Sequence, residues 1–193
     1  MSQGNVASYL KSLWEIASSV EVTDQYGKHL DLDDTISELI MTVRNTHNAG
    51  NKILFVGNGG SAAIASHMAI DYSKNGRLRS MALNDAAALT CLSNDLGYER
   101  VFSKQIEMLG NQHDVLFAIS SSGMSKNILQ AADVAKEKKL HLVTFSGFSA
   151  DNRLRNLGGL NFYIPSNEYG FVEISHLTLC HAILDFKMGW QNV

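Results

Sequence analysis

The sequence has few cysteines, a single proline and no long hydrophobic segment. Its two cysteines, Cys91 and Cys180, lie far apart and lack the C-x-x-C spacing of metal and redox motifs. The longest apolar runs fall far short of the roughly 20 residues that a membrane helix needs, and no secretory leader precedes the body. We therefore expect a protein of the reducing cytoplasm with no membrane partner.

The chain also lacks a strong excess of charge of either sign. Its formal net charge is -3 at pH 7 and its pI is about 6.1. This balance provides no basic surface for nucleic acid, so we expect no DNA or RNA partner. With 193 residues, 45% of them hydrophobic, the chain can bury one substantial core. We expect a single domain over residues 1–193.

Two helices are predicted before the first strand. Residues 6–19 form the first, and Asp31 and Asp33 introduce a second helix with apolar residues at helical spacing from Ile36 to Val43. Neither helix has a partner in an alternating strand and helix scheme. We therefore predict that residues 1–50 are a helical extension that covers the domain or packs against another subunit.

From Lys52 onward, short β-branched or aromatic runs alternate with segments of helical length. The predicted strands are 52–56, 79–83, 114–119, 140–146 and 160–164, and a closing helix follows over about 171–188. This alternation predicts parallel strands joined by right-handed crossovers, hence an α/β three-layer sandwich around a five-stranded parallel sheet. Ligands bind such sheets beyond the carboxyl ends of the strands.

Two loops rich in glycine or serine follow two of these strands. Gly57-Asn-Gly-Gly-Ser61 follows the first strand, and Ser120-Ser-Ser-Gly-Met-Ser125 follows the third. Glycines let the backbone approach a ligand, while free amide N–H groups and a helix N-terminus attract an anion. The second loop has more hydroxyl groups than one N-cap needs, which suits a phosphate monoester. The pair predicts a phosphorylated small molecule as ligand.

The first loop has two further interpretations. Gly57-Asn-Gly-Gly-Ser-Ala62 fits the loose G-x-G-x-x-A pattern of dinucleotide-binding turns, for which Asn84-Asp85 would supply the acidic group. A tight strand-to-helix turn without a ligand is the other interpretation. The serine-rich loop argues against an empty turn, and the chain has no room for the separate substrate domain of a dehydrogenase.

The two loops, together with His67, Asn94-Asp95, Glu173 and His181, resemble the sugar isomerase (SIS) domain, and within it the bacterial phosphoheptose isomerases. The resemblance extends over about residues 32–187. It implies a flavodoxin-like fold and the conversion of sedoheptulose 7-phosphate to D-glycero-D-manno-heptose 7-phosphate, on the route to heptose for lipopolysaccharide or capsule. The substrate-binding positions of the family correspond here to Asn58, Gly59, Gly60, Ser61, Asn94, Asp95, Ser120, Ser121, Ser122 and Ser125.

The resemblance also implies one Zn²⁺ per subunit, at positions that are His67, Asp71, Glu173 and His181 here. Both histidines match the family, whereas Asp71 replaces a glutamate and Glu173 replaces a glutamine. An aspartate arm is shorter by about 1.5 Å, the length of a C–C bond. The carbon base is therefore either Glu173 or Asp71, with His181 as the acid near the carbonyl oxygen.

The spacing of these residues leaves the metal ligands open. His67 and Asp71 share a helical face, but Glu173 and His181 lie about 12 Å apart along an ideal helix. His176 is therefore an alternative ligand, and so is a residue of a neighbouring subunit. A family aspartate before the last helix is Gly170 here, which leaves the choice of sugar open.

The resemblance further implies a homotetramer with its active site between subunits. Two other kinds of SIS protein stay as alternatives: a non-catalytic sugar-phosphate-binding regulator and a tetrameric replication-initiator-associating protein. Loss of the catalytic residues would mark them, and His67 and His181 are present here. Ordinary structural roles also stay open, namely a core or interface position for both histidines, a solvent-facing Asp71, and a plain turn over 94–97.

Overall fold

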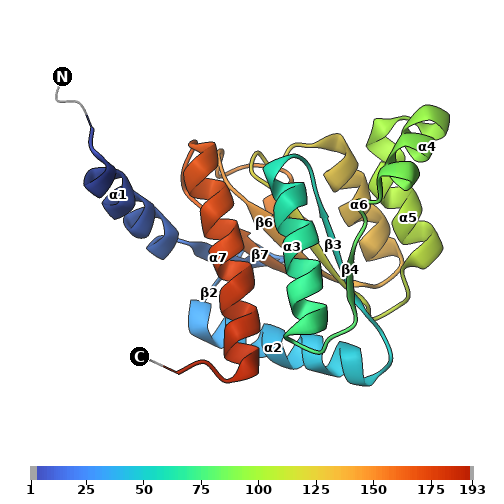
Figure 1. Cartoon of the computed structure of the whole chain (residues 1–193), viewed down its shortest axis with the longest axis horizontal. Helices are drawn as coiled ribbons and strands as arrows, with labels where there is room; N and C mark the ends of the chain where they lie inside the picture. Colours follow the sequence, from blue (N-terminus) through green and yellow to red (C-terminus); the bar gives the residue numbers. More distant parts are fainter. Residues whose placement is uncertain (1–3, 192–193) are drawn as a thin grey trace.

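The computed structural model describes residues 4–191, in which seven strands form one mixed sheet with helices on both faces (Figure 1). The strand order is β2-β1-β7-β6-β5-β3-β4, and β3 to β7 run parallel to one another. The strands are β1 (Glu21–Asp24), β2 (His29–Leu30), β3 (Ile53–Gly57), β4 (Ser80–Ala82), β5 (Val115–Ser120), β6 (His141–Ser146) and β7 (Leu160–Tyr163). The predicted α/β class is confirmed.

The predicted number of strands is wrong, because β1 and β2 lie between the two leading helices. β1 pairs antiparallel with both β2 and β7, at the edge of the sheet. Its Glu21 carboxylate pairs with Arg155 at 2.6 Å, and Asn161 donates to the carbonyl oxygen of Thr23 at 3.2 Å. These partners lie more than a hundred positions further along the chain, so no local pattern announces the strand.

The helices form two layers (Figure 1). One face of the sheet is covered by α2 (Leu32–Asn48), α3 (Gly60–Lys74) and α7 (Tyr169–Met188), and the other by α4 (Ala86–Leu96), α5 (Val101–Leu109) and α6 (Lys126–Glu137). Strand side chains alternate between the two cores, as Ile53 and Phe55 do with Leu54 and Val56. No helix within residues 4–191 is both long and apolar enough to cross a membrane.

The two leading helices have different environments. Asp31 caps α2 by accepting the backbone N–H of Asp34 at 3.0 Å, and Ile36, Leu39 and Val43 are buried against the sheet. This helix therefore covers the domain. In contrast, α1 (Val6–Ser18) has no buried residue, and it extends away from the body (Figure 1). Its contact with α7 includes the ring of Tyr9, 4.7 Å from that of Phe171.

The order of the parallel strands indicates where a ligand would bind. From β3 the chain crosses to β4 on one side, and it then returns to β5 on the other side of β3. At such a switch point the neighbouring connections leave in opposite directions, which opens a crevice at the carboxyl ends of the two strands. The glycine loop follows β3 and the serine loop follows β5, so both loops border this crevice.

Candidate active site

A pocket of about 340 Å³ lies at the carboxyl ends of β3 and β5. Its walls are the glycine loop, the serine loop and the first turns of α7. The lining residues are Asn58, Gly59, Gly60, Ser61, Ser120, Ser121, Ser122, Ser125, Tyr169 and Glu173. The structure thus brings together the predicted residues of both loops, and Glu173 with them.

Backbone conformation explains the glycines of the first loop. Gly59 precedes α3 with φ of 54° and ψ of -123°, a conformation that residues with a side chain rarely adopt. At Gly60, a Cβ atom would overlap the carboxyl group of Glu173. The absence of a side chain at position 60 therefore provides the space in which this carboxylate lies.

The hydroxyl groups of the serine loop make few hydrogen bonds within the protein: Oγ of Ser120 donates to Oγ of Ser125 at 3.4 Å, and Oγ of Ser122 accepts the backbone N–H of Met124 at 3.2 Å. The Oγ atom of Ser121 is buried and has no hydrogen-bond partner in the described part of the chain. Ser125 occupies the N-cap of α6 without bonding to that helix through its side chain. Helix α3 begins on the opposite side of the pocket, so two helix N-termini border it. Free hydroxyl and N–H donors beside two helix N-termini suit an anion.

The ionisable groups of the pocket are unevenly distributed. No lysine or arginine is among the residues that line it, whereas Glu173 contributes a carboxylate. An anion bound here would be held by neutral donors rather than by ion pairs. No lysine or arginine of the lining therefore competes for the carboxylate, which suits a role as general base.

A second cluster lies between α3 and α7. Ligand atoms of His67, Asp71 and His181 lie within 4.8 Å of one another. Nε2 of His67 is 3.5 Å from Oδ2 of Asp71, one helical turn away, and the rings of the two histidines are 5.3 Å apart. Two imidazoles and a carboxylate with an open side fit a zinc ion, and the side chain of His67 is 51% exposed.

The structure divides the four predicted metal ligands between two places. Glu173 lies two turns before His181 on α7 and is not part of the cluster in the described chain. It lines the pocket instead. The spacing along α7 explains this, because eight residues of helix extend about 12 Å.

His176, the alternative ligand, faces the sheet. Its side chain is fully buried, with Nε2 donating to the carbonyl oxygen of Ser146 at 3.0 Å and its ring 5.9 Å from that of Phe145. Burial lowers the pKa of this histidine to about 4. It therefore stays neutral as part of the core, away from the His67 cluster.

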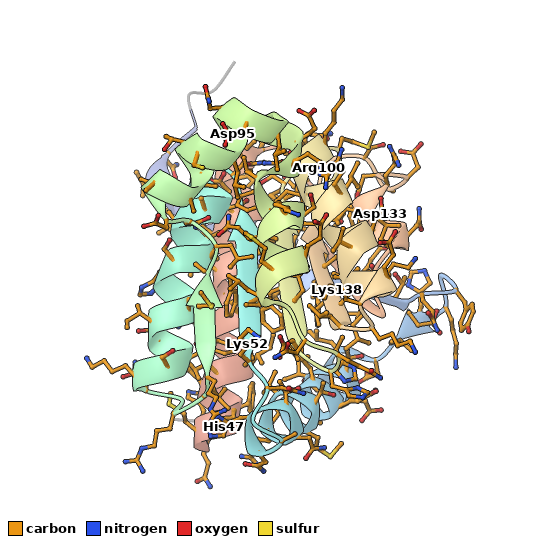
Figure 2. The ribbon with its side chains drawn as sticks, turned by 90° about the vertical axis from the view of Figure 1, so that its right-hand side faces the viewer. His47, Lys52, Asp95, Arg100, Asp133 and Lys138 are labelled. Carbon is orange, nitrogen blue, oxygen red and sulfur yellow. The ribbon has the colours of Figure 1, made fainter. Side chains whose placement is uncertain are left out.

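Asn94 and Asp95 do not reach the pocket of their own chain. They lie in the exposed last turn of α4, where Nδ2 of Asn94 donates to Oδ1 of Asp95 at 2.9 Å. Figure 2 shows Asp95 at the end of the molecule opposite His47. Tyr98, which follows them, does reach the glycine loop, since its hydroxyl group donates to Oδ1 of Asn58 at 3.0 Å.

Sequence reasoning missed three residues at or beside the pocket. Tyr169 lines it, and Tyr98 and Asn127 bond to Asn58. A polar residue in the first turn of α6, next to the serine loop, was the one local signal for Asn127. Neither tyrosine belongs to a local pattern, because the tertiary fold alone places Tyr169 in the pocket and Tyr98 on Asn58 beside it.

Comparison with known proteins agrees with this geometry. The family model of the SIS domain matches residues 17–147. The phosphoheptose isomerase of Helicobacter pylori strain P12 is 35% identical over 160 residues, which are 80% of this chain and 81% of that protein. The phosphoheptose isomerase of Thermodesulfovibrio yellowstonii is 33% identical over 174 residues, 86% of this chain and 85% of that protein.

Solved structures show the same relationship. The structure of the phosphoheptose isomerase GmhA from Neisseria gonorrhoeae superimposes with a TM-score of 0.79 at 29% identity, covering 94% of this chain and 97% of that chain. Sequence, fold and the arrangement of the two loops thus agree with the resemblance. The chain belongs to the SIS-domain family and, within it, to the group of the phosphoheptose isomerases.

Proposed function

We propose that the protein is an aldose-ketose isomerase that converts sedoheptulose 7-phosphate to D-glycero-D-manno-heptose 7-phosphate for heptose biosynthesis. The observation that carries the proposal is the Glu173 carboxylate, which lies against Gly60 in a pocket otherwise lined by neutral groups. The two loops bind the phosphate and hydroxyl groups of the sugar. Glu173 then faces the carbon atoms that exchange a proton.

The reaction needs two proton transfers. The Glu173 carboxylate removes a proton from C1 of the ketose, which leaves a 1,2-enediol, and the resulting carboxylic acid exchanges its proton with solvent before it protonates C2 to give the aldose. His181 moves the second proton from the C1 hydroxyl group to the oxygen on C2. Asp71 is the alternative carbon base, and its position 3.5 Å from His67 favours a role beside that histidine instead.

His67, Asp71 and His181 are the residues that would hold a zinc ion, with Glu173 as a further ligand if α7 or a neighbouring chain moves it closer. When bound, zinc would supply Lewis-acid polarisation of the substrate carbonyl. His181 belongs both to this cluster and to the proposed proton relay. Measuring activity with and without zinc would separate the metal-binding role of His181 from its role in proton transfer.

We further propose that the protein works as a homotetramer in the cytoplasm. On α1, Val6, Leu10 and Trp14 are exposed, and on α7 Ile174 and Phe186 are exposed. Such apolar side chains on two neighbouring helices suit burial between subunits. Both cysteines are free, as expected in a reducing compartment, and the aldose product would serve lipopolysaccharide or capsule assembly.

The direct test is proton NMR of sedoheptulose 7-phosphate with the protein in deuterated water, with added zinc and with a chelator. We expect an aldose with deuterium at C2, and its loss in Glu173→Gln and His181→Ala. The matched control is Glu168→Gln, an exposed glutamate just before α7. No turnover in the wild-type protein, with phosphate still binding, would instead indicate a sugar-phosphate-binding regulator.

A further inference from the structure

Two asparagines connect the glycine loop to the serine-loop side of the pocket. Nδ2 of Asn58 donates to Oδ1 of Asn127 at 2.9 Å, and Nδ2 of Asn127 donates back to Oδ1 of Asn58, also at 2.9 Å. Asn127 lies in the first turn of α6 and is 3% exposed, so the pair is shielded from water on that side. This reciprocal bond crosses the switch point between β3 and β5.

The backbone fixes which way both amides face. Oδ1 of Asn127 also accepts the backbone N–H of Ile128 at 3.0 Å, so Asn127 cannot turn its NH₂ group to that side without losing this bond. Its NH₂ group therefore faces Oδ1 of Asn58. If Asn58 turned over, oxygen would face oxygen and NH₂ would face NH₂, so one orientation alone satisfies the pair.

A third residue supports this orientation. Tyr98 lies on the short 3₁₀ helix Tyr98–Arg100, between α4 and α5, and its hydroxyl group donates to Oδ1 of Asn58 at 3.0 Å. The oxygen of Asn58 thus accepts two hydrogen bonds and has no lone pair left. Neither Tyr98 nor Asn127 is among the residues that line the pocket.

The remaining hydrogen-bonding capacity of Asn58 suits an anion. Its Nδ2 atom uses one of its two hydrogens for Asn127, which leaves one amide hydrogen for a bound molecule. In this orientation Asn58 presents a donor to the pocket rather than an acceptor. A phosphate oxygen attracts an N–H group and repels a carbonyl oxygen, so the orientation of one amide changes the sign of the contact.

We propose that Asn127, supported by Tyr98, is a positioning residue of the phosphate site. It holds Asn58 with its amide hydrogen towards the bound ester, and it fixes the glycine loop at a set distance from the serine loop. The inference rests on the proposed function only in naming a phosphate ester as the ligand. Because it acts through Asn58, Asn127 affects substrate affinity and not the proton transfers.

Tyr98→Phe and Asn127→Leu test the proposal by steady-state kinetics. We expect KM for sedoheptulose 7-phosphate to rise about threefold in Tyr98→Phe and about tenfold in Asn127→Leu, the effects of losing one and two hydrogen bonds. The value of kcat should stay within about twofold, because the lost contact is the same in the ground and transition states. Titration with inorganic phosphate, followed by ³¹P NMR, should show the same losses of affinity.

Two matched variants control for general destabilisation. Tyr163→Phe removes a hydroxyl group that donates to the carbonyl oxygen of Phe148 at 2.8 Å. Asn161→Leu removes a fully buried amide that bonds Thr144 and the backbone of β1. Neither Tyr163 nor Asn161 lines the pocket. Both should lower the unfolding midpoint while leaving KM and phosphate affinity within about twofold of wild type.

A double-mutant cycle decides whether Asn127 acts through Asn58. In an Asn58→Ala background, Asn127→Leu and Tyr98→Phe should weaken phosphate binding no further than about twofold. Losses that add in full would overturn the proposal, as would unchanged phosphate affinity in folded Tyr98→Phe and Asn127→Leu proteins. Phosphate binding does not require turnover. If the wild-type protein fails to isomerise the sugar, the proposed function fails, but the phosphate-binding measurements still test this inference.

Discussion

At the scale of single residues, one missing methyl group shapes the site. The Glu173 carboxyl group occupies the space that a Cβ atom at Gly60 would fill. Gly60 is the first residue of α3, where alanine is a better helix former than glycine. A substitution at this position can therefore displace the carboxylate without lowering the stability of the fold.

We expect Gly60→Ala to fold normally and to lose about 100-fold in kcat, since it displaces the carboxylate that we propose as the general base. Steady-state kinetics and thermal unfolding of the same preparation measure the two effects. Gly159→Ala is the matched control, because a Cβ atom there would meet one atom, a backbone oxygen, at the ordinary distance of 3.6 Å. Normal activity of Gly60→Ala would mean that Glu173 is not the carbon base.

His176 predicts how stability depends on pH. Burial lowers its pKa from 6.5 to about 4, so the unfolded chain takes up the proton first as the pH falls. The contribution of the neutral ring to stability is therefore complete above pH 6.5 and is lost between pH 6.5 and about 4. At 1.36 kcal/mol for each pKa unit, the total loss from this group is about 3 kcal/mol.

Urea unfolding at pH 7 and at pH 4.5 measures this loss. In His176→Gln the side-chain amide can still donate to Ser146, so we expect a flatter dependence of the free energy of unfolding on pH. His29→Gln, at an exposed histidine, should follow the wild-type curve. Parallel curves for wild type and His176→Gln would show that other groups carry the acid sensitivity.

At the scale of elements, one carboxylate joins the starts of two central strands. Asp114 is fully buried just before β5, and it accepts the backbone N–H of Lys52, just before β3, at 2.9 Å. It also pairs with Nζ of Lys52 at 2.6 Å and accepts the backbone N–H of Asn111 at 2.8 Å. Figure 2 shows Lys52 towards the lower end of the molecule, well below Asp95.

We expect Asp114→Ala to lower the free energy of unfolding by about 3 kcal/mol, because it leaves two backbone donors and a partly buried ammonium group unpaired. Urea unfolding measures the change. Asp133→Ala, on the exposed face of α6, should stay within about 0.5 kcal/mol of wild type. An equal loss in both variants would show that the pairing at Lys52 adds nothing.

The positions of the helices and parallel strands were the features that the sequence predicted best. The five parallel strands begin and end close to their predicted positions, because buried β-branched runs bounded by turns are a local signal. Asp31 likewise marks the start of α2 by its side chain alone. β1 and β2 escaped prediction because both are short, and β1, which pairs with β2, is held in the sheet by β7, far along the chain.

At the scale of the whole molecule, α1 contacts α7 but keeps most of its surface exposed in the described part of the chain. Trp14 is 73% exposed and Leu10 57%, on a helix with no buried residue. Exposed aromatic and aliphatic side chains at helical spacing are typical of a face that packs against another subunit. The cluster of His67, Asp71 and His181 also has an open side, where a group from another subunit would fit.

We expect a tetramer by light scattering coupled to size-exclusion chromatography, and smaller species for the double variant Leu10→Asp, Trp14→Asp. If the active site is shared between subunits, this variant should keep its far-UV circular dichroism and lose activity. Lys11→Asp, on an exposed polar position of the same helix, is the control. A folded and fully active monomer would contradict a shared site.

The sequence by itself determined the features that depend only on residues adjacent in the chain. Glycines and serines placed after strands predict loops suited to an anion, because backbone conformation and helix capping are local properties. Tertiary structure alone decided which groups meet. Strand order put the two loops side by side, the pitch of α7 separated Glu173 from His181, and Asn127 found Asn58 across the sheet. These outcomes depend on packing between distant segments, which no local pattern contains.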